Sequence, residues 1–339
     1  MVVRNQAVEQ RASSTANPLL VVLLGPTASG KSSLAMALAR RFGGEIVSCD
    51  SVAVYRGLEI GAAKPTAAER REIPHHLIDV AELDETYSAG EYARRARAAI
   101  AEITACNRLP IVSGGTGLYL RALLDGLFGG PQRSEPLRQR LRERAEGRGV
   151  LWVHRILARL DPVSAARIHA HDLPKTIRAI EVSLAERRPM SEAWQAGRDP
   201  LSGYRILRLG LEPERPRLYA RIDARARQMF AEGLVEEARE LLDHYGANSP
   251  PALDSLGYRQ AAGYLRAELT LEEAIAATSQ GHRNYAKRQR TWFRREPEVA
   301  WLHGFGDEPG IRDQAEGLVA QSLVEGALRP IRTETGTAR

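Results

Sequence analysis

The segment Gly25-Pro26-Thr27-Ala28-Ser29-Gly30-Lys31-Ser32 has the residue types and spacing of a phosphate-binding loop. It fits the pattern GxxxxGK[ST] in full and lies between an apolar run and a helical segment, as this motif requires. The glycines let backbone N–H groups converge on phosphate oxygens, the lysine adds a positive charge, and the Ser32 hydroxyl can ligate Mg²⁺. The pattern predicts a phosphate site, as in nucleotide-binding and ATP-binding proteins, but does not indicate which phosphate compound binds.

Two further segments end at the same edge of the predicted sheet. Asp50 ends the apolar run EIVSCD, and open α/β sheets place their sites at the carboxyl ends of strands. It suits a Mg²⁺ ligand or a general base, and a helix cap or a solvated loop acid explains its position equally well. Gly114-Gly115-Thr116-Gly117 follows the run LPIVS, where a P-loop NTPase would normally carry an acid. Backbone could approach a ligand closely there, with the Thr116 hydroxyl as a partner; an ordinary strand-to-helix turn is the alternative.

A basic run lies near the end of the chain. Residues 282–295 hold six Lys or Arg and no acid, with Tyr285, Trp292 and Phe293 interleaved. Basic and aromatic side chains together suit phosphate contacts and base stacking. A solvated helix face with buried aromatics explains the same pattern, and in isolation it is the favoured interpretation. The net charge of +6 favours polyanionic partners but fixes no fold.

Apolar runs alternate with helical segments in the first part of the chain, and this alternation predicts a parallel sheet covered by helices. The predicted fold class is therefore α/β, a P-loop NTPase-like core with a helical insert. From Asp125 the strand-like runs give way to Arg-rich helical segments, and YRILRLGLE then returns to the sheet before long helices follow. We expect disordered tails at 1–18 and 326–339, a core of 19–124 and 199–325, and an insert of 125–198.

Several classes of protein are disfavoured by the composition. The two cysteines, Cys49 and Cys106, form no CxxC pair, so neither a zinc cluster nor a disulfide framework is expected. Isolated thiols suit a reducing cytosol, and the first residues contain no apolar signal segment. No stretch approaches ~20 consecutive apolar residues, so no membrane span is expected. We expect a cytoplasmic protein.

These pieces together resemble the tRNA dimethylallyltransferases, also called isopentenyl-tRNA transferases, from about Val21 to Trp301. Any one block is modestly specific, whereas all of them in this order are very specific. The blocks are GPTASGKS at 25–32, DSVAVYRGLEIGAAKPT from Asp50, GGTGLYLRALLDGL from Gly114, RIHAHDLPKTIRAIEV from Arg167, RIDARARQM from Arg221, LGYRQ from Leu256 and YAKRQRTWFR from Tyr285.

The resemblance implies transfer of the dimethylallyl group of dimethylallyl diphosphate to the exocyclic amine of an adenosine just 3′ of the tRNA anticodon. The P-loop would then hold a prenyl diphosphate, with Mg²⁺ as cofactor and Ser32 as its protein ligand. By the same resemblance Asp50 is the general base, Thr116 lies beside the reacting centre and Arg225 clamps the diphosphate. The implied diphosphate-binding residues are Gly25, Thr27, Ala28, Ser29, Gly30, Lys31 and Ser32.

The resemblance also implies a surface for the tRNA anticodon stem-loop, part of it on the insert, and we expect a monomer. The implied contacts are Asp50, Ser51, Val52, Ala53, Arg138, Lys175, Arg178, Gly257, Tyr258, Arg259, Lys287, Arg288, Gln289 and Arg294. The chain departs from the family pattern at Lys175, where an arginine is usual, and at His282-Arg283-Asn284, where Thr-Arg-Gln is usual. Lysine keeps the charge but lacks the planar fork of arginine.

Two other functions fit some of these features. A small-molecule kinase would use the P-loop for ATP, but the missing acid after LPIVS and the basic C-terminal helix count against it. An RNA-binding protein with a P-loop switch is the second alternative. Asp50 beside the P-loop, and a sequence without a recognisable RNA-binding module, count against that function.

Overall fold

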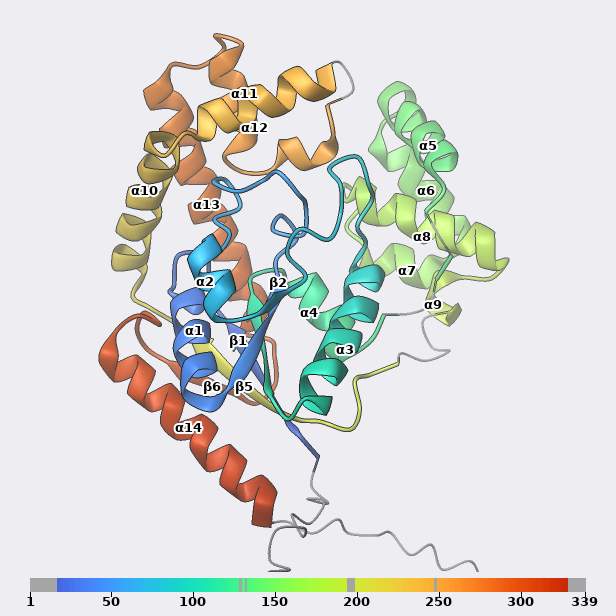
Figure 1. Ribbon diagram of the computed structural model, residues 1–339. Helices are drawn as coiled ribbons and strands as arrows, with labels where there is room; N and C mark the ends of the chain where they lie inside the picture. The colour runs from blue at the N-terminus through green and yellow to red at the C-terminus, as the bar shows by residue number, and fades with distance from the viewer. Residues whose placement is uncertain (1–16, 128–129, 132, 194–198, 247–248, 329–339) are drawn as a thin grey trace, which may run out of the picture. The chain divides into compact units, whose positions relative to one another are not determined.

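The computed structural model describes residues 17–127, 130–131, 133–193, 199–246 and 249–328 (Figure 1). Residues 1–16 and 329–339 of the expected tails lie outside the described residues. The chain forms two compact units: Leu124–Leu201 is one, and the other described residues make up the second. The sequence analysis placed the insert at 125–198. Each unit is described by itself.

The larger unit is built on a six-stranded sheet with the order β3-β2-β4-β1-β5-β6. All neighbouring strands are parallel. The strands are β1 (Leu19–Leu24), β2 (Gly44–Cys49), β3 (His75–His76), β4 (Leu109–Gly114), β5 (Arg205–Leu211) and β6 (Val299–Leu302). The α/β prediction with a parallel sheet is confirmed. The sheet is wider than expected, because the edge strands β3 and β6, of two and four residues, are too short to be recognised in the sequence.

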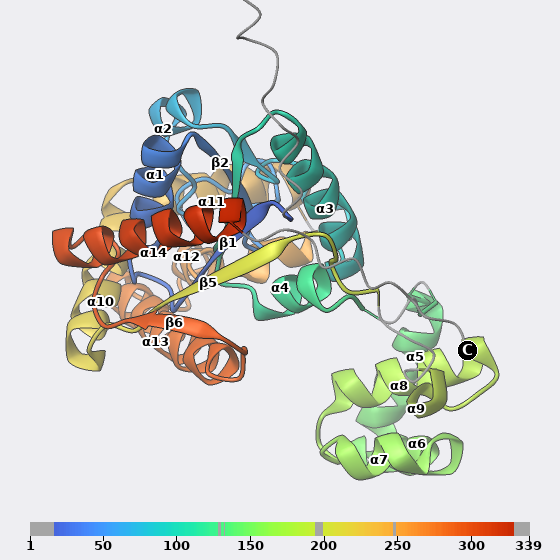
Figure 2. The same cartoon turned by 90° about the horizontal axis from the view of Figure 1, so that it is seen from below.

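Both faces of the sheet are covered, which explains why β1 is apolar at every position. Alternate residues of a strand point to opposite faces, and all six residues of β1 are buried. On one face, Leu19, Val21 and Leu23 share a core with helices α1 (Lys31–Phe42) and α14 (Pro309–Leu328). Helix α3 (Ala89–Ala105) packs against β2 and β4, and Figure 2 shows it on the other side of the sheet from α14.

Helix boundaries follow local signals. Ser88 caps the start of α3, since its side chain accepts a hydrogen bond from Glu91 N at 3.1 Å. The short helices α2 (Ala67–Glu72) and α4 (Gly117–Leu124) follow β2 and β4 along the chain. Helix α14 runs to Leu328, so it includes residues 326–328, which the sequence analysis assigned to a tail. Within the described residues, no helix is both long and apolar enough to span a membrane.

A layer of helices from the C-terminal half packs on the loop that follows β2. It consists of α10 (Arg215–Ala231), α11 (Leu234–Tyr245), η3 (Pro251–Asp254), α12 (Tyr258–Leu265) and α13 (Leu271–Phe293). Leu58 of the loop is fully buried against Phe230, Leu234 and Tyr258 of this layer. The loop is therefore held in place by residues almost two hundred positions later in the sequence.

All the regular elements described in the smaller unit are helices. It contains α5 (Glu135–Arg148), α6 (Val150–Leu160), α7 (Pro162–Arg167), α8 (Leu173–Glu186) and α9 (Met190–Ala193). Its own core includes Leu141, Val153, Leu157 and Ile180. Because these residues recur at helical spacing on α5, α6 and α8, the unit buries an apolar interior of its own.

Candidate active site

A cavity of about 440 Å³ lies at the carboxyl ends of the central strands in the larger unit. Its lining brings together segments that are far apart in the sequence, because the parallel strands end at one edge. The lining includes residues 27–32, Asp50, Gly114, Gly115, Arg221, Arg225, Gln228, Tyr285 and Gln289. Of the expected diphosphate-binding residues, all but Gly25 line the cavity, and Gly25 directly follows β1.

The P-loop connects β1 to α1, with Gly30 capping the helix in a left-handed conformation (φ 87°). The free N–H groups of the first helical turn are therefore directed at the cavity, as in other anion sites at helix N-termini. Lys31 Nζ donates to Pro26 O at 2.6 Å, which holds the side chain along the loop. The buried hydroxyl of Ser29 makes no hydrogen bond within the described part of the chain.

Two of the cationic side chains that line the cavity are Lys31, from the P-loop, and Arg225, from α10. Burial of the ammonium, with the nearby charge of Arg225, lowers the pKa of Lys31 to about 7, although Asp50 opposes the shift. Burial also lowers the pKa of Arg225. The Arg225 guanidinium lies 3.4 Å from Thr27 Oγ1, so it faces the P-loop from the opposite side of the cavity. Two poorly hydrated cations facing one space make a site for an anion of high charge.

The two oxygens of the Asp50 carboxylate have different surroundings. Oδ1 accepts hydrogen bonds from Val52 N at 2.8 Å and Ala53 N at 3.3 Å. Oδ2 has no hydrogen-bond partner among the residues that the structure describes. One oxygen therefore fixes the carboxylate to the following loop, and the other is available to accept a proton in the cavity.

Thr116 lies at the turn after β4 and is tied to the Asp50 loop. Its Oγ1 accepts a hydrogen bond from Ser51 N at 3.0 Å and lies 3.3 Å from Ser51 Oγ. Gly115 N and Thr116 N both donate to Cys49 O at 3.1 Å. A side chain at Gly115 would collide with the Gln289 amide, since its Cβ would lie 2.1 Å from Nε2. The glycines of this turn thus allow the close approach of α13.

Helix α13 lines the cavity with Tyr285, one of the aromatics of the basic run, and with Gln289, for which the sequence predicted no structural role. Gln289 is 4% exposed, accepts from Thr27 N at 2.7 Å and donates to Gly115 O at 2.9 Å. Tyr285 Oη donates to the same carbonyl at 3.2 Å. His282 is buried, and desolvation together with Arg225 lowers its pKa to about 4, so its ring is neutral near pH 7. This helix therefore joins the P-loop to the turn after β4.

Of the residues of the larger unit expected to contact tRNA, Asp50, Ser51 and Val52 are half-buried and Ala53 is buried, in the loop after β2. The others, on the helical layer, divide into two groups. Lys287, Arg288, Arg294 and Arg259 are exposed. Gly257, Tyr258 and Gln289 are buried, and the Tyr258 hydroxyl bonds to Glu237 and to Gly61 N. On the helical layer, the buried side chains pack in the protein interior, and the exposed group presents its side chains to solvent.

Within the smaller unit, two of the three expected tRNA contacts serve a buried carboxylate. Glu181 is 2% exposed and binds both Arg138, at 3.0 Å, and Arg178, at 2.6 Å. Burial alone would raise the pKa of Glu181, but the two guanidiniums and Ser134 N lower it to about 2. Lys175 remains largely exposed and pairs with Asp172, the cap of α8. Arg138 and Arg178 therefore stabilise the fold of this unit, whatever else they contact.

The chemistry of the cavity suits a hard metal ion carried with a phosphate. Within the described residues, no three His, Cys, Asp or Glu side chains gather as a metal-binding group. The Ser32 hydroxyl and the Asp50 carboxylate both line the cavity. Mg²⁺ is usually bound through one or two protein oxygens together with substrate phosphates and water, so these residues fit a substrate-borne Mg²⁺.

Sequence reasoning missed several residues that line the site. Lys64, from the loop after β2, lines this cavity and an adjoining one of about 580 Å³, and so does Gln228 of α10. Arg221 also lines the first cavity and pairs with Asp307. Arg221 and Gln228 lie four residues before and three residues after Arg225 on the same helix, so helical spacing around Arg225 was the signal that could have found them. No comparable local signal marks Lys64.

Comparisons with known proteins agree with this arrangement. A family model described as IPP transferase matches residues 53–296. The chain is 63% identical over 306 residues to a tRNA dimethylallyltransferase from Koribacter versatilis (strain Ellin345), covering 90% of this chain and 99% of that protein.

Solved structures give the same result. The full-length tRNA isopentenylpyrophosphate transferase from Bacillus halodurans has a TM-score of 0.67 at 36% identity, over 91% of this chain and 98% of that one. A eukaryotic dimethylallyltransferase acting on tRNA has a TM-score of 0.79 at 24% identity, over 94% of this chain and 81% of that one, a similarity of fold. The protein therefore belongs to the IPP transferase family.

Proposed function

We propose that this protein transfers the dimethylallyl group from dimethylallyl diphosphate to the exocyclic amine of the adenosine 3′-adjacent to the anticodon in tRNAs. The products are isopentenyladenosine and diphosphate. The observation that carries the proposal is the single cavity in which the P-loop, Arg225 and Asp50 meet, in a chain of this family. A cytoplasmic location and a monomeric state stay predictions.

The P-loop and Arg225 form the diphosphate end of the proposed site. The backbone N–H groups at the start of α1 and the charge of Lys31 bind the phosphate oxygens on one side. Arg225 binds from the other side, where its fork can contact two oxygens at once. The Ser29 hydroxyl supports this assignment, because it is buried and has no hydrogen-bond partner among the described residues, so a ligand oxygen could supply one.

The proposed reaction forms one bond and breaks one. The adenine amine attacks C1 of the dimethylallyl group, the C1–O bond breaks, and the bonding electrons leave with the diphosphate. The amine is a weak nucleophile because its lone pair is delocalised into the ring. Asp50 Oδ2 accepts its proton as the attack proceeds, and Lys31 and Arg225 neutralise the charge that develops on the leaving diphosphate.

A bound Mg²⁺ would supply further neutralisation of the diphosphate charge, and Ser32 would hold it on the protein side. The adenine must leave its stack to reach a cavity at the sheet edge, so base flipping is part of the proposal. Lys287, Arg288, Arg294 and Arg259 are the exposed side chains of the larger unit proposed to contact the tRNA backbone. Lys175 has this role on the smaller unit.

Incubation with labelled dimethylallyl diphosphate, Mg²⁺ and bulk tRNA, followed by nucleoside analysis, tests the function directly. The expected product is isopentenyladenosine in tRNA, with one diphosphate released per label incorporated. Omitting Mg²⁺ and adding a chelator tests the proposed metal separately. Labelled tRNA in which the modified nucleoside lies outside the anticodon loop, or no incorporation at all, would overturn the proposal.

A further inference from the structure

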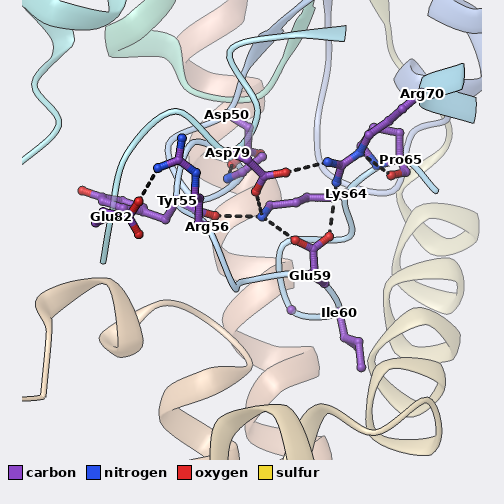
Figure 3. Close-up of polar contacts among 12 residues, drawn as sticks. Asp50, Tyr55, Arg56, Glu59, Ile60, Lys64, Pro65, Arg70, Asp79 and Glu82 are labelled. Atoms are coloured by element: carbon purple, nitrogen blue, oxygen red, sulfur yellow. Dashed lines mark hydrogen bonds and ion pairs between the residues drawn. The ribbon is translucent and has the colours of Figure 1, made fainter. Parts of the chain in front are cut away.

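The loop between β2 and α2 ends in a lysine whose side chain is buried. The Lys64 side chain is 1% exposed, yet its ammonium carries a charge at the edge of the proposed active site. Nζ donates to Tyr55 O at 2.8 Å, to Glu59 Oε1 at 2.9 Å and to Asp79 Oδ1, as Figure 3 shows. Three acceptors around three N–H bonds satisfy the ammonium completely.

These three hydrogen bonds limit the roles that Lys64 can have in the reaction. Taking a charge out of water costs several kcal/mol, by order of magnitude, unless good partners replace the water. With all three donors engaged by the protein, Lys64 has none left for a phosphate oxygen. A role in the reaction must therefore pass through the residues that Lys64 binds.

The partners of Lys64 belong to a network of two cations and two anions. Arg70, from α2, pairs with Asp79 at 2.5 Å and with Glu59 at 3.2 Å, and donates to Pro65 O at 2.9 Å. Burial alone would raise the pKa of Asp79, but hydrogen bonds from Lys64 and Arg70 outweigh it, and the pKa is lowered. Asp79 is thus the anion on which both cations converge, as Figure 3 shows.

A chain of hydrogen bonds connects this network to the proposed general base. Lys64 binds the Asp79 carboxylate, and Asp79 N donates to Ala53 O at 3.2 Å. Ala53 N in turn donates to Asp50 Oδ1 at 3.3 Å. The same peptide segment therefore has its carbonyl on Asp79 and its N–H on Asp50.

The backbone near the network is held in conformations that need support. Ala63, directly before Lys64, has φ 46°, and Asp79 has φ 57°. Left-handed backbone at a residue other than glycine is unfavourable, and it persists only where contacts with the surrounding structure hold it. The segments on both sides of the ammonium thus depend on contacts such as those of Lys64.

We infer that Lys64 is a positioning residue for Asp50: its buried ammonium fixes the loop after β2 against Asp79, so that Ala53 stays bound to Asp50 Oδ1 and Oδ2 stays directed at the substrate amine. This inference rests on the proposed function. It assigns to Lys64 no contact with either substrate.

The test is Lys64→Met, which keeps the length of the side chain and removes the charge. At saturating tRNA the rate of dimethylallyl transfer is expected to fall at least about tenfold, since small displacements of a reacting group cost this much or more. The KM for dimethylallyl diphosphate should stay within about threefold, because the diphosphate contacts are untouched. Arg40→Met is the matched control, since it removes a cation from an exposed pair with Glu72 on the outer helices, and its rate should equal that of wild type.

A double-mutant cycle separates positioning from a general loss of structure. If Lys64 acts through Asp50, adding Lys64→Met to Asp50→Asn should lower the transfer rate by less than about threefold. The base that Lys64 positions is already absent in that background. If Lys64→Met does not fold, Asp79→Asn decides the matter. It keeps the backbone bond to Ala53 and should lower the rate at least about threefold, again only when Asp50 is present.

The outcomes that overturn the inference are distinct from failure of the function. A wild-type protein without prenyl transfer sinks the proposed function. If the wild-type protein transfers the prenyl group and Lys64→Met does so at the wild-type rate, only the inference about Lys64 is overturned. Full additivity with Asp50→Asn, or a raised KM for the diphosphate at a normal rate, also sinks it, because Lys64 would then act elsewhere or on the substrate.

Discussion

The two carboxylate oxygens of Asp50 have different roles. Oδ1 accepts hydrogen bonds from the backbone of Val52 and Ala53, and Oδ2 has no partner in the described part of the chain. The residue lines the cavity. An asparagine at this position keeps an oxygen for the two N–H groups but loses the ability to take a proton. Asp50→Asn is therefore a clean test of the base, because the loop keeps its hydrogen bonds.

We expect Asp50→Asn to lower the single-turnover rate at least ~10²-fold, the usual scale for loss of a general base. Affinity for tRNA should stay within a few-fold. Rapid-quench kinetics and filter binding on one preparation give both values. A near-normal rate would remove Asp50 from the chemistry, whereas a large loss of tRNA binding would make it mainly a recognition residue.

Lys31 gives a second prediction at this scale, on the pH dependence of diphosphate binding. In the free protein, burial and the neighbouring Arg225 lower the pKa of Lys31 to about 7. A bound diphosphate favours the charged ammonium, so binding above pH 7 must bring a proton onto Lys31. Affinity is then full below this pKa and falls by up to about tenfold per pH unit above it.

Calorimetry near pH 8 in two buffers of different ionisation heat checks this sign. Net proton uptake is expected on binding of dimethylallyl diphosphate, and Lys31→Met should bind more weakly and take up no proton. Uptake that persists in Lys31→Met would assign the proton to another group.

Helix α13 shows how one element serves two purposes. Its buried side, at Gln289 and Tyr285, bonds to the P-loop and to Gly115 O. Its exposed side carries Lys287 and Arg288. The sequence left two interpretations of the basic run open, a nucleic-acid surface and a solvated helix face with buried aromatics. Neither included the buried polar side chain of Gln289.

Substitutions on the two sides of α13 should have different effects. Neutralising Lys287, Arg288 and Arg294 together is expected to weaken tRNA binding and to reduce its salt dependence by about one log–log unit per lost phosphate contact. Gln289→Leu, on the buried side of the same helix, should lower prenyl transfer without changing the salt slope. An unchanged slope in the triple variant would mean that this face is merely solvated.

On helix α12, the structure leads to a different expectation for Tyr258 than the sequence did. Tyr258 was expected to contact tRNA, but it is 1% exposed and its hydroxyl bonds to Gly61 N and Glu237. Tyr258→Phe should therefore destabilise the protein by about 1–3 kcal/mol, the usual cost of leaving buried groups unpaired. Affinity for tRNA should change less than about twofold. Urea unfolding and filter binding measure the two quantities, and a reversed pattern would restore Tyr258 as an RNA contact.

At the scale of the whole molecule, the sequence predicted those features that depend on local sequence patterns. The strands β1, β2, β4 and β5 are apolar runs, and the P-loop lies where its motif requires, between β1 and α1. Parallel strands end at one edge, so the meeting of Asp50 and Thr116 followed from the α/β pattern. Edge strands of two and four residues, β3 and β6, are too short to show a pattern.

Contacts between residues far apart in the chain could not be predicted from the sequence. Gln289 reaches Thr27 across 262 positions, and Tyr258 reaches Gly61 across 197. Nothing near Lys64 in the chain indicates that Asp79 and Tyr55 will enclose it. Such contacts are set by how the helical layer packs on the sheet, which local spacing does not encode.

The whole molecule also decides between the prenyltransferase and a P-loop kinase. A P-loop NTPase holds its metal and water with an acid after the strand next to the P-loop. Here β4 ends in Gly114, and the space beside the turn is taken by Gln289 and Tyr285 of α13. Asp50, from β2, is instead the carboxylate that lines the cavity.

Dimethylallyl diphosphate should therefore bind at the P-loop, and ATP should compete weakly at best, without tRNA-stimulated hydrolysis. A diphosphate alone fills the cradle formed by residues 27–32, so the adenosine of ATP should add little affinity. Lys31→Ala should impair prenyl transfer by removing charge from the leaving group, a contact worth roughly 2–4 kcal/mol in comparable sites. A paired assay on one preparation measures prenyl transfer to tRNA and phosphate release from ATP with a panel of nucleoside monophosphates. Robust ATP turnover without prenyl transfer would favour the kinase, because a kinase needs the γ-phosphate that a prenyltransferase never uses.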